Sequence, residues 1–159
     1  MKQLWAPWRL EYIVGPKEGE CFLCRMLRED KDRENLVLRR GATCAIVMNR
    51  FPYSNGHLMV CPNRHIADLT DLTREERAEM MDRITQSIEA LRKTVHPHGF
   101  NVGANLGKVA GAGLEAHLHM HIVPRWESDT NFMPVLGQTK VIPQCCYELW
   151  DQLQPLLND

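Results

Sequence analysis

Residues 117–123 read His-Leu-His-Met-His-Ile-Val, with an imidazole at every second position and an apolar side chain after each one. Successive side chains of a β-strand point to opposite faces, so this spacing places His117, His119 and His121 on one face. The apolar residues between them then lie on the other face, against a core. The β-branched residues that end the stretch also favour a strand. The sequence therefore predicts a strand whose three histidines face a cavity or solvent.

Such a row of histidines has three interpretations. A merely polar sheet face fits poorly, because histidine is a weak strand former and the whole chain contains only seven. A metal site is the second interpretation, since neutral imidazole is the commonest nitrogen ligand of protein metals. The third is covalent catalysis, in which one ring attacks phosphorus and its neighbours donate hydrogen bonds to the phosphate oxygens. The stretch alone leaves metal binding and covalent catalysis open.

The size and charge of the chain narrow the classes of function. Its 159 residues suffice for one domain with a real core. With 19 basic and 20 acidic residues and a formal net charge of -1, the chain lacks the excess of positive charge that is typical of proteins that bind nucleic acid or an anionic membrane. No apolar run approaches the roughly 20 residues that span a bilayer. Residues 1–5 lack the apolar core of a signal peptide, so we expect a cytoplasmic, reducing location in which cysteines are thiols or metal ligands.

Hydrophobic patterns and turn residues outline the remaining elements. Strands are predicted at 36–38, 44–48, 57–61 and 100–105. Thr73 and Glu76 form a capping-box pattern that opens one long helix. Shorter helices are predicted at 25–29 and from residue 144 until an interruption near Pro155, and residues 30–35 are predicted to be a solvated charged loop. The apolar stripe of the long helix is Met80, Met81, Ile84, Ile88 and Leu91, which predicts core or subunit interface.

A second group of chemical interest is the C-x-x-C pair Cys21 and Cys24, the commonest half of a structural zinc site. A redox dithiol is the competing interpretation, but it prefers a strand-to-helix turn in a thioredoxin-like context. His65 and His117 are candidates for the other two metal ligands. The remaining cysteines are predicted to behave as small buried hydrophobic residues: Cys44, Cys61, Cys145 and Cys146.

The segment 106–113, immediately before the histidine strand, contains three glycines, the last of which is Gly113. A glycine-rich approach lets the backbone come close to a ligand. Taken alone it would indicate only a flexible connection. Its position next to the histidines favours ligand binding.

The histidine stretch resembles the signature of the histidine triad family, His-x-His-x-His followed by hydrophobic residues. Asn49 and the segment 56–62 (Gly-His-Leu-Met-Val-Cys-Pro) resemble the paired strands and purine-ribose pocket of that family. Residues 4–9 and 131–144 resemble the branch that includes diadenosine tetraphosphate phosphorylases. Nearly the whole chain is therefore covered by the resemblance.

The resemblance implies an α+β fold with a five-stranded antiparallel sheet, one long helix and shorter helices, paired as a homodimer. One domain would span residues 1–159, with an N-terminal arm (1–20) and a C-terminal extension (125–159). The implied chemistry is nucleotidyl transfer at the α-phosphate of adenine nucleotides such as dinucleoside polyphosphates. The implied catalytic residues are His119, His121 and His57; the implied substrate-binding residues are Asn49, Asn105 and Gly113; and the implied zinc ligands are Cys21, Cys24, His65 and His117.

The family also implies a role for each of these side chains. His119 would be the nucleophile that forms a nucleoside-phosphohistidine intermediate, while His121 and His57 hold the phosphate. Asn49 would contact the ribose, and Asn105 would lie near the phosphates. The zinc would support the site without performing the chemistry.

One departure from the family concerns the residues just before the triad. Hydrolase branches carry a Ser, Thr or Gln there, whereas residues 113–116 read Gly-Leu-Glu-Ala. The missing hydroxyl is compatible with the phosphorylase branch, in which inorganic phosphate replaces water as the acceptor. Hydrolysis of a dinucleoside polyphosphate or a nucleoside phosphoramidate, and a non-catalytic nucleotide-binding regulator, are the alternatives.

Overall fold

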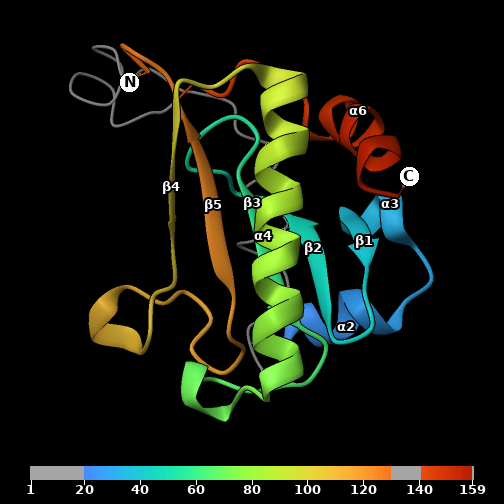
Figure 1. The fold of residues 1–159 in the computed structure, drawn as a ribbon, viewed down its shortest axis with the longest axis vertical. Coiled ribbons are helices and arrows are strands. Elements are labelled where there is room, and N and C mark those ends of the chain that lie inside the picture. The colour runs from blue at the N-terminus through green and yellow to red at the C-terminus, as the bar shows by residue number, and fades with distance from the viewer. Residues whose placement is uncertain (1–19, 130–140, 159) are drawn as a thin grey trace, which may run out of the picture.

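A computed structural model describes residues 20–129 and 141–158 of the chain. Its centre is one antiparallel sheet of five strands in the order β1-β2-β3-β5-β4 (Figure 1). The strands are β1 (Val37–Arg40), β2 (Cys44–Met48), β3 (Leu58–Pro62), β4 (Gly99–Gly103) and β5 (Met120–Arg125). Together with the helices described below, this sheet confirms the predicted α+β class.

The long helix α4 (Arg74–Val95) crosses one face of the sheet (Figure 1). It begins at the predicted capping box. The Thr73 hydroxyl accepts a hydrogen bond from the Glu76 backbone N–H, and the Glu76 carboxylate accepts one from the Thr73 N–H. Both exchanges satisfy backbone donors that a helix start leaves unpaired.

The apolar stripe of α4 packs onto the sheet, with Met80, Ile84 and Leu91 buried and Ile88 partly buried. Met81 is not part of this core, because it is 61% exposed, and for this residue only the alternative of a subunit interface stays as a prediction. Neighbouring helical residues point about 100° apart, so Met81 cannot share the buried line of Met80.

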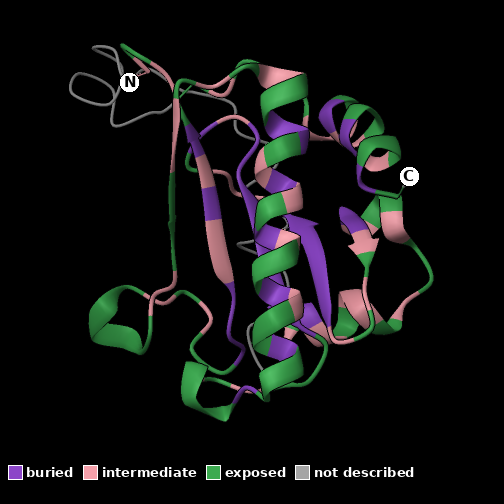
Figure 2. Ribbon diagram, in the orientation of Figure 1, coloured by how far each residue is buried: buried purple, intermediate pink, exposed green. Residues whose placement is uncertain are grey.

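Two cores lie on opposite faces of the sheet, because alternate residues of a strand point to opposite sides. Cys44 and Ile46 of β2 belong to the core beneath α4, whereas Ala45 and Val47 belong to a second core beneath the helix α2 (Phe22–Arg28). Figure 2 shows the central strands as largely buried. The helix α2 begins three residues earlier than predicted, directly after Cys21.

The histidine stretch lies on the α2 side of the sheet. Leu118 and Ile122 are buried in the core beneath α4, so the histidines that alternate with them face the other way. The strand ladder begins only at Met120, later than predicted, and the Leu118 N–H instead donates to the Ile66 carbonyl at 2.6 Å. The rings are also more enclosed than expected: His117 is 0% and His119 is 8% exposed.

The helix α6 (Cys146–Asn158) continues through Pro155, so the predicted interruption there is wrong. Proline removes one helical hydrogen bond and clashes with the preceding turn. Here Leu149, Leu153 and Leu157, spaced four residues apart, are all buried against the core. This continuous apolar face keeps the last turn helical.

The helix α6 also lies along β1, one of the two edge strands (Figure 1). The Trp150 Nε1–H donates to the Val37 carbonyl at 3.0 Å, and the Asn158 Nδ2–H donates to the Leu38 carbonyl at 2.8 Å. Side chains of α6 thus occupy backbone acceptors of this edge strand.

The predicted charged loop 30–35 contains a one-turn helix, α3 (Asp32–Asn35). Its Arg33 makes a bidentate ion pair with Asp151 of α6, at 2.8 and 2.9 Å. This contact holds part of segment 30–35 in place, although its many charged residues predicted a solvated loop. Two further single turns are η1 (Leu69–Asp71) and η2 (Lys108–Ala110).

The cysteines outside the C-x-x-C pair behave in two ways. Cys44 and Cys61 are fully buried, as predicted, whereas Cys145 is exposed and Cys146 is only partly buried. Within the described residues, no helix is long and apolar enough to cross a membrane. The segments 4–9 and 131–140, which carry part of the family resemblance, lie outside the described residues.

Candidate active site and metal centre

His119 has its tautomer set by the backbone. Its Nδ1–H donates to the carbonyl oxygen of His117 at 2.8 Å. A neutral imidazole carries one proton, so the Nε2 of His119 keeps a free lone pair. The His119 ring stands edge-on to that of His121, with ring centroids 4.8 Å apart. This nitrogen has the electronic state that a nucleophile requires.

A chain of hydrogen bonds also sets the tautomers of His57 and His121. The Tyr53 backbone N–H donates to Nδ1 of His57 at 3.1 Å, and the Asn49 Nδ2 lies 3.3 Å from the same nitrogen. Because Nδ1 accepts, the His57 proton resides on Nε2, which donates to Nδ1 of His121 at 2.9 Å. His121 therefore carries its proton on Nε2, as a hydrogen-bond donor.

The loop that supplies His57 is held close to the helices by Gly56. This glycine has φ +70°, a conformation that side chains rarely adopt, and a Cβ built on it would lie 2.9 Å from Cδ2 of Leu91. The absence of a side chain lets the loop pack against α4 and turn directly into β3.

The environment of His121 predicts a pH dependence. Burial, with a smaller contribution from His119, lowers the pKa of His121 from 6.5 to about 4. Between those pH values the unfolded chain binds the proton more strongly than the folded one does. We therefore expect the contribution of His121 to the free energy of unfolding to be present above pH 6.5 and to be lost as the pH falls toward about 4.

Titration of the histidine ring signals by NMR measures this pKa directly, and the His121→Asn variant identifies which signal belongs to His121. The same variant should lose less stability than the wild-type protein when the pH falls from 6.5 toward about 4. An ordinary pKa near 6.5 for His121 would contradict the expectation. With the lowered pKa, the His121 ring is uncharged at neutral pH and donates a hydrogen bond only through its Nε2–H.

The four predicted metal ligands converge on one point. The ligand atoms of Cys21, Cys24, His65 and His117 all lie within 4.8 Å of one another. Cys21 Sγ lies 3.2 Å from Nδ1 of His117, and Cys24 Sγ lies 3.2 Å from Nδ1 of His65 and 3.4 Å from that of His117. The Nε2–H of His117 donates to the Pro62 carbonyl at 2.9 Å, which leaves Nδ1 free to face the sulfurs.

This cluster fits a tetrahedral metal ion. Bonds of 2.0–2.3 Å to nitrogen and sulfur in a tetrahedron imply ligand-to-ligand distances of about 3.3–3.8 Å, close to the three sulfur-to-nitrogen distances of 3.2, 3.2 and 3.4 Å. Partial burial and the hydrogen bond with Cys21 raise the pKa of the Cys24 thiol to about 11. A cation between the two sulfurs would remove that penalty by stabilising both thiolates. The cluster could therefore hold a metal ion with two sulfur and two nitrogen ligands.

The segment that carries His65 is anchored by the side chain of the preceding residue, Arg64. The Arg64 guanidinium makes a bidentate ion pair with Glu76 at 2.7 and 2.8 Å and donates to the Asp71 carbonyl at 3.0 Å. The Arg64 hydrogen bond holds the pKa of Glu76 down to about 2. The start of α4 thus fixes the backbone next to the candidate metal ligand His65.

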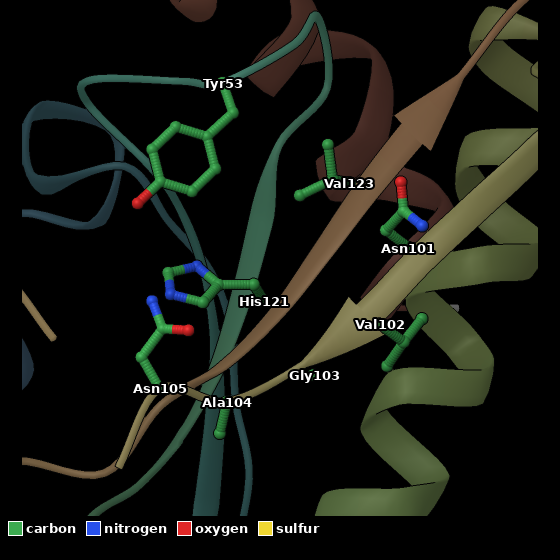
Figure 3. Close-up of a pocket in the computed structure, with 8 residues that line it drawn as sticks. All are labelled: Tyr53, Asn101, Val102, Gly103, Ala104, Asn105, His121 and Val123. Atoms are coloured by element: carbon green, nitrogen blue, oxygen red, sulfur yellow. The ribbon is translucent and has the colours of Figure 1, made fainter. Parts of the chain in front are cut away.

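A pocket of about 270 Å³ opens beside His121, on the side of β4 (Figure 3). Of the predicted substrate-binding residues, Asn105 lines this pocket, whereas Asn49 contacts His57 and Gly113 is exposed outside the pocket lining. Tyr53 also lines it, although no feature of the sequence singled that residue out. Its remaining lining residues are Asn101, Val102, Gly103, Ala104 and Val123.

Comparisons with known proteins agree with this geometry. The family model described as HIT domain matches residues 31–128. A protein of Mycobacterium tuberculosis named AP-4-A phosphorylase is 40% identical over 152 residues, which cover 91% of this chain and 78% of the relative. The asymmetrical bis(5'-nucleosyl)-tetraphosphatase of Schizosaccharomyces pombe is 30% identical over 93 residues, covering 58% of this chain and 50% of that protein.

Among solved structures, a zinc-bound histidine triad family protein from Mycobacterium smegmatis superposes with a TM-score of 0.69 and 25% identity. The match covers 87% of this chain and 93% of the other. The fold, the histidine geometry and the sequence matches lead to one conclusion: this chain belongs to the HIT domain family.

Proposed function

We propose that this protein is a nucleotidyl transferase that acts at the α-phosphate of dinucleoside polyphosphates, in the manner of a diadenosine tetraphosphate phosphorylase. The observation that carries the proposal is the hydrogen bond from Nδ1 of His119 to the His117 carbonyl, which leaves Nε2 free to attack phosphorus. The 40% identity to a relative named AP-4-A phosphorylase supports the choice of substrate.

The reaction takes place in two steps. The lone pair of His119 Nε2 forms a bond to the α-phosphorus, and the bond from phosphorus to the bridging oxygen breaks, its electron pair leaving with the departing nucleotide. An acceptor oxygen then attacks the phosphorus, and the N–P electron pair returns to Nε2. Throughout, the Nδ1–H stays on His119 and is held by the His117 carbonyl.

His121 and His57 stabilise the negative charge that develops on the phosphate oxygens. The Nε2–H of His121 is the donor toward them, and the chain of Tyr53, His57 and His121 keeps that proton in place. Asn49 contributes through the same chain, and we propose that its ribose contact and the contacts of Asn105 and Gly113 form when substrate binds.

We propose zinc as the metal of the cluster formed by Cys21, Cys24, His65 and His117, because two sulfur and two imidazole ligands in a tetrahedron are typical of structural zinc. When bound, zinc would supply a cross-link between the segment before α2 and the strand that bears the histidines. A reducing cytoplasm, which keeps both cysteines as thiols, is the proposed location.

We further propose that the chain forms one HIT domain over residues 1–159 and pairs as a homodimer. Side chains of α6 occupy acceptors of β1, whereas no strand within the described residues pairs with the outer side of β4. An edge strand of this kind accepts a second copy of itself by strand pairing.

The test is the product pattern from diadenosine tetraphosphate with and without inorganic phosphate, separated by chromatography. We expect ADP and ATP only when phosphate is present, since residues 113–116 offer no hydroxyl to assist water. AMP and ATP regardless of phosphate would identify water as the acceptor and a hydrolase. No product under either condition, with AMP or ADP bound in calorimetry, would favour a non-catalytic regulator.

A further inference from the structure

The pocket beside His121 exists because a glycine stands opposite that histidine. In the register of β4 and β5, Gly103 pairs with His121 and Asn101 pairs with Val123, so these four residues share one face of the sheet. A Cβ built on Gly103 meets no atom within 4 Å. The space next to the His121 ring is therefore left by a missing side chain and is not occupied by any neighbour among the described residues.

The walls of this pocket are polar but uncharged. They offer the amides of Asn101 and Asn105 and the phenol of Tyr53, with apolar surface from Val123, and no Lys, Arg, Asp or Glu is among the lining residues. The Asn101 Oδ1 accepts from Arg125 at 2.8 Å, so its Nδ2 is the group left to donate. The Asn105 Nδ2 lies 3.4 Å from the Gly111 carbonyl, so its Oδ1 is the group left to accept.

Tyr53 presents an aromatic ring at the edge of this pocket. Tyr53 is 53% exposed, and its ring centroid lies 4.7 Å from that of His57 and 5.7 Å from that of His121. Figure 3 shows the His121 ring lying between the Tyr53 ring and the Asn105 amide. An exposed aromatic ring gives a nucleobase of any kind a surface for stacking.

We propose that this pocket binds the second nucleoside of a dinucleoside polyphosphate, the one that leaves, with its base against the Tyr53 ring and its polar groups on Asn101 and Asn105. This inference rests on the proposed function. A phosphate ion is a poor occupant, because anions in proteins are held by cations or by several converging N–H groups. The volume of about 270 Å³ lies just below the roughly 300–1,000 Å³ typical of small-molecule sites, and the pocket is open to solvent at the exposed Tyr53.

The inference makes Gly103 and Tyr53 determinants of substrate selectivity. Selectivity is measured as the ratio of kcat/KM for diadenosine tetraphosphate to kcat/KM for adenosine 5'-phosphoramidate, which transfers the same adenylyl group but releases no nucleoside. Effects on His119 or on the first nucleoside cancel in this ratio. Effects on the second nucleoside remain in it.

The first variant is Gly103→Val, which fills the pocket, and its matched control is Gly99→Val. Gly99 lies on the same strand and face, outside the pocket, and a Cβ there also meets nothing within 4 Å. We expect the ratio to fall at least about tenfold in Gly103→Val and to stay unchanged in Gly99→Val. An unchanged ratio in folded Gly103→Val would overturn the inference.

If Gly103→Val does not fold, the pair Tyr53→Ala and Tyr53→Phe decides. Both variants keep the backbone N–H that holds His57, and only the first removes the ring. Loss of base stacking should lower the ratio at least about fivefold in Tyr53→Ala, with no such change in Tyr53→Phe. Equal ratios in the two variants would count against a stacked base.

The wild-type protein separates failure of this inference from failure of the proposed function. Turnover of the phosphoramidate alone would overturn the second-nucleoside site and leave the chemistry of His119 standing. Turnover of neither compound would overturn the proposed function, and the inference with it.

Discussion

Replacement of His119 by alanine should lower kcat for diadenosine tetraphosphate by about 10⁴-fold or more, because the nucleophile itself is removed. Binding of AMP should change little. The 8%-exposed ring makes one hydrogen bond, to the His117 carbonyl, and the other described groups around it keep their own partners. Steady-state turnover and calorimetry together measure both effects.

The covalent step itself is measured by quenching the enzyme in base after reaction with substrate labelled at the α-phosphate. Wild-type protein should retain label as a base-stable phosphoramidate, and the His119→Ala variant should retain none. The control is His98→Ala, an exposed histidine remote from the site, for which kcat should stay within about twofold. Normal turnover or labelling in His119→Ala would refute the assignment of His119 as nucleophile.

The second large effect is expected from Cys24→Ser. Loss of one thiolate should abolish stoichiometric metal binding and, because the metal binds only the folded chain, lower the free energy of unfolding by about 3–5 kcal/mol and Tm by about 10–20 °C. His119 is coupled to this site, since the carbonyl that holds its Nδ1–H belongs to His117. Elemental analysis of the purified protein and thermal unfolding followed by circular dichroism give the two values.

The matched control for the metal site is Cys145→Ser, which changes an exposed thiol outside the cluster. It should leave metal content and Tm unchanged. Wild-type protein treated with a chelator should match Cys24→Ser in Tm. Full metal content in Cys24→Ser, or a Tm that is insensitive to the chelator, would argue against a structural metal at this cluster.

The sequence predicted the two central strands β2 and β3 well because every residue of both is buried, which gives continuous apolar runs. β2 and β3 were predicted within one residue of their bounds, and Thr73 and Glu76 marked the start of α4 correctly. The errors arose where tertiary contacts override local preference. Pro155 stays helical because the leucines of α6 pack on the core, and an ion pair to Asp151 orders part of the charged loop.

The candidate site was only partly readable from the sequence. Cys21 and Cys24 are close together in the chain, and the histidines alternate along one strand. Both patterns are local, so they could be recognised from the sequence directly. The convergence of His65 with the cysteines needed the family resemblance, since 41 residues separate it from Cys24. Tautomers depend on which carbonyl or N–H lies opposite each ring nitrogen, and no local pattern records that.

Tyr53 and Gly103 show why pocket residues are hard to predict. Each has an ordinary local explanation, one as a turn residue and the other as the end of a strand. Their shared role depends on the pairing register of β4 with β5 and on the path of the loop before β3. Both are set by contacts between segments far apart in the chain.

The placement of α6 along β1 limits how copies of this chain can polymerise. Growth of a filament by strand addition requires each subunit to offer two free edges, one to bind and one to be bound. Trp150 and Asn158 donate hydrogen bonds to carbonyls of β1, so among the described residues β4 is the edge strand left open to a second copy. The β4 pairing proposed above would therefore end after two copies, because α6 would cover the outer edge of each copy.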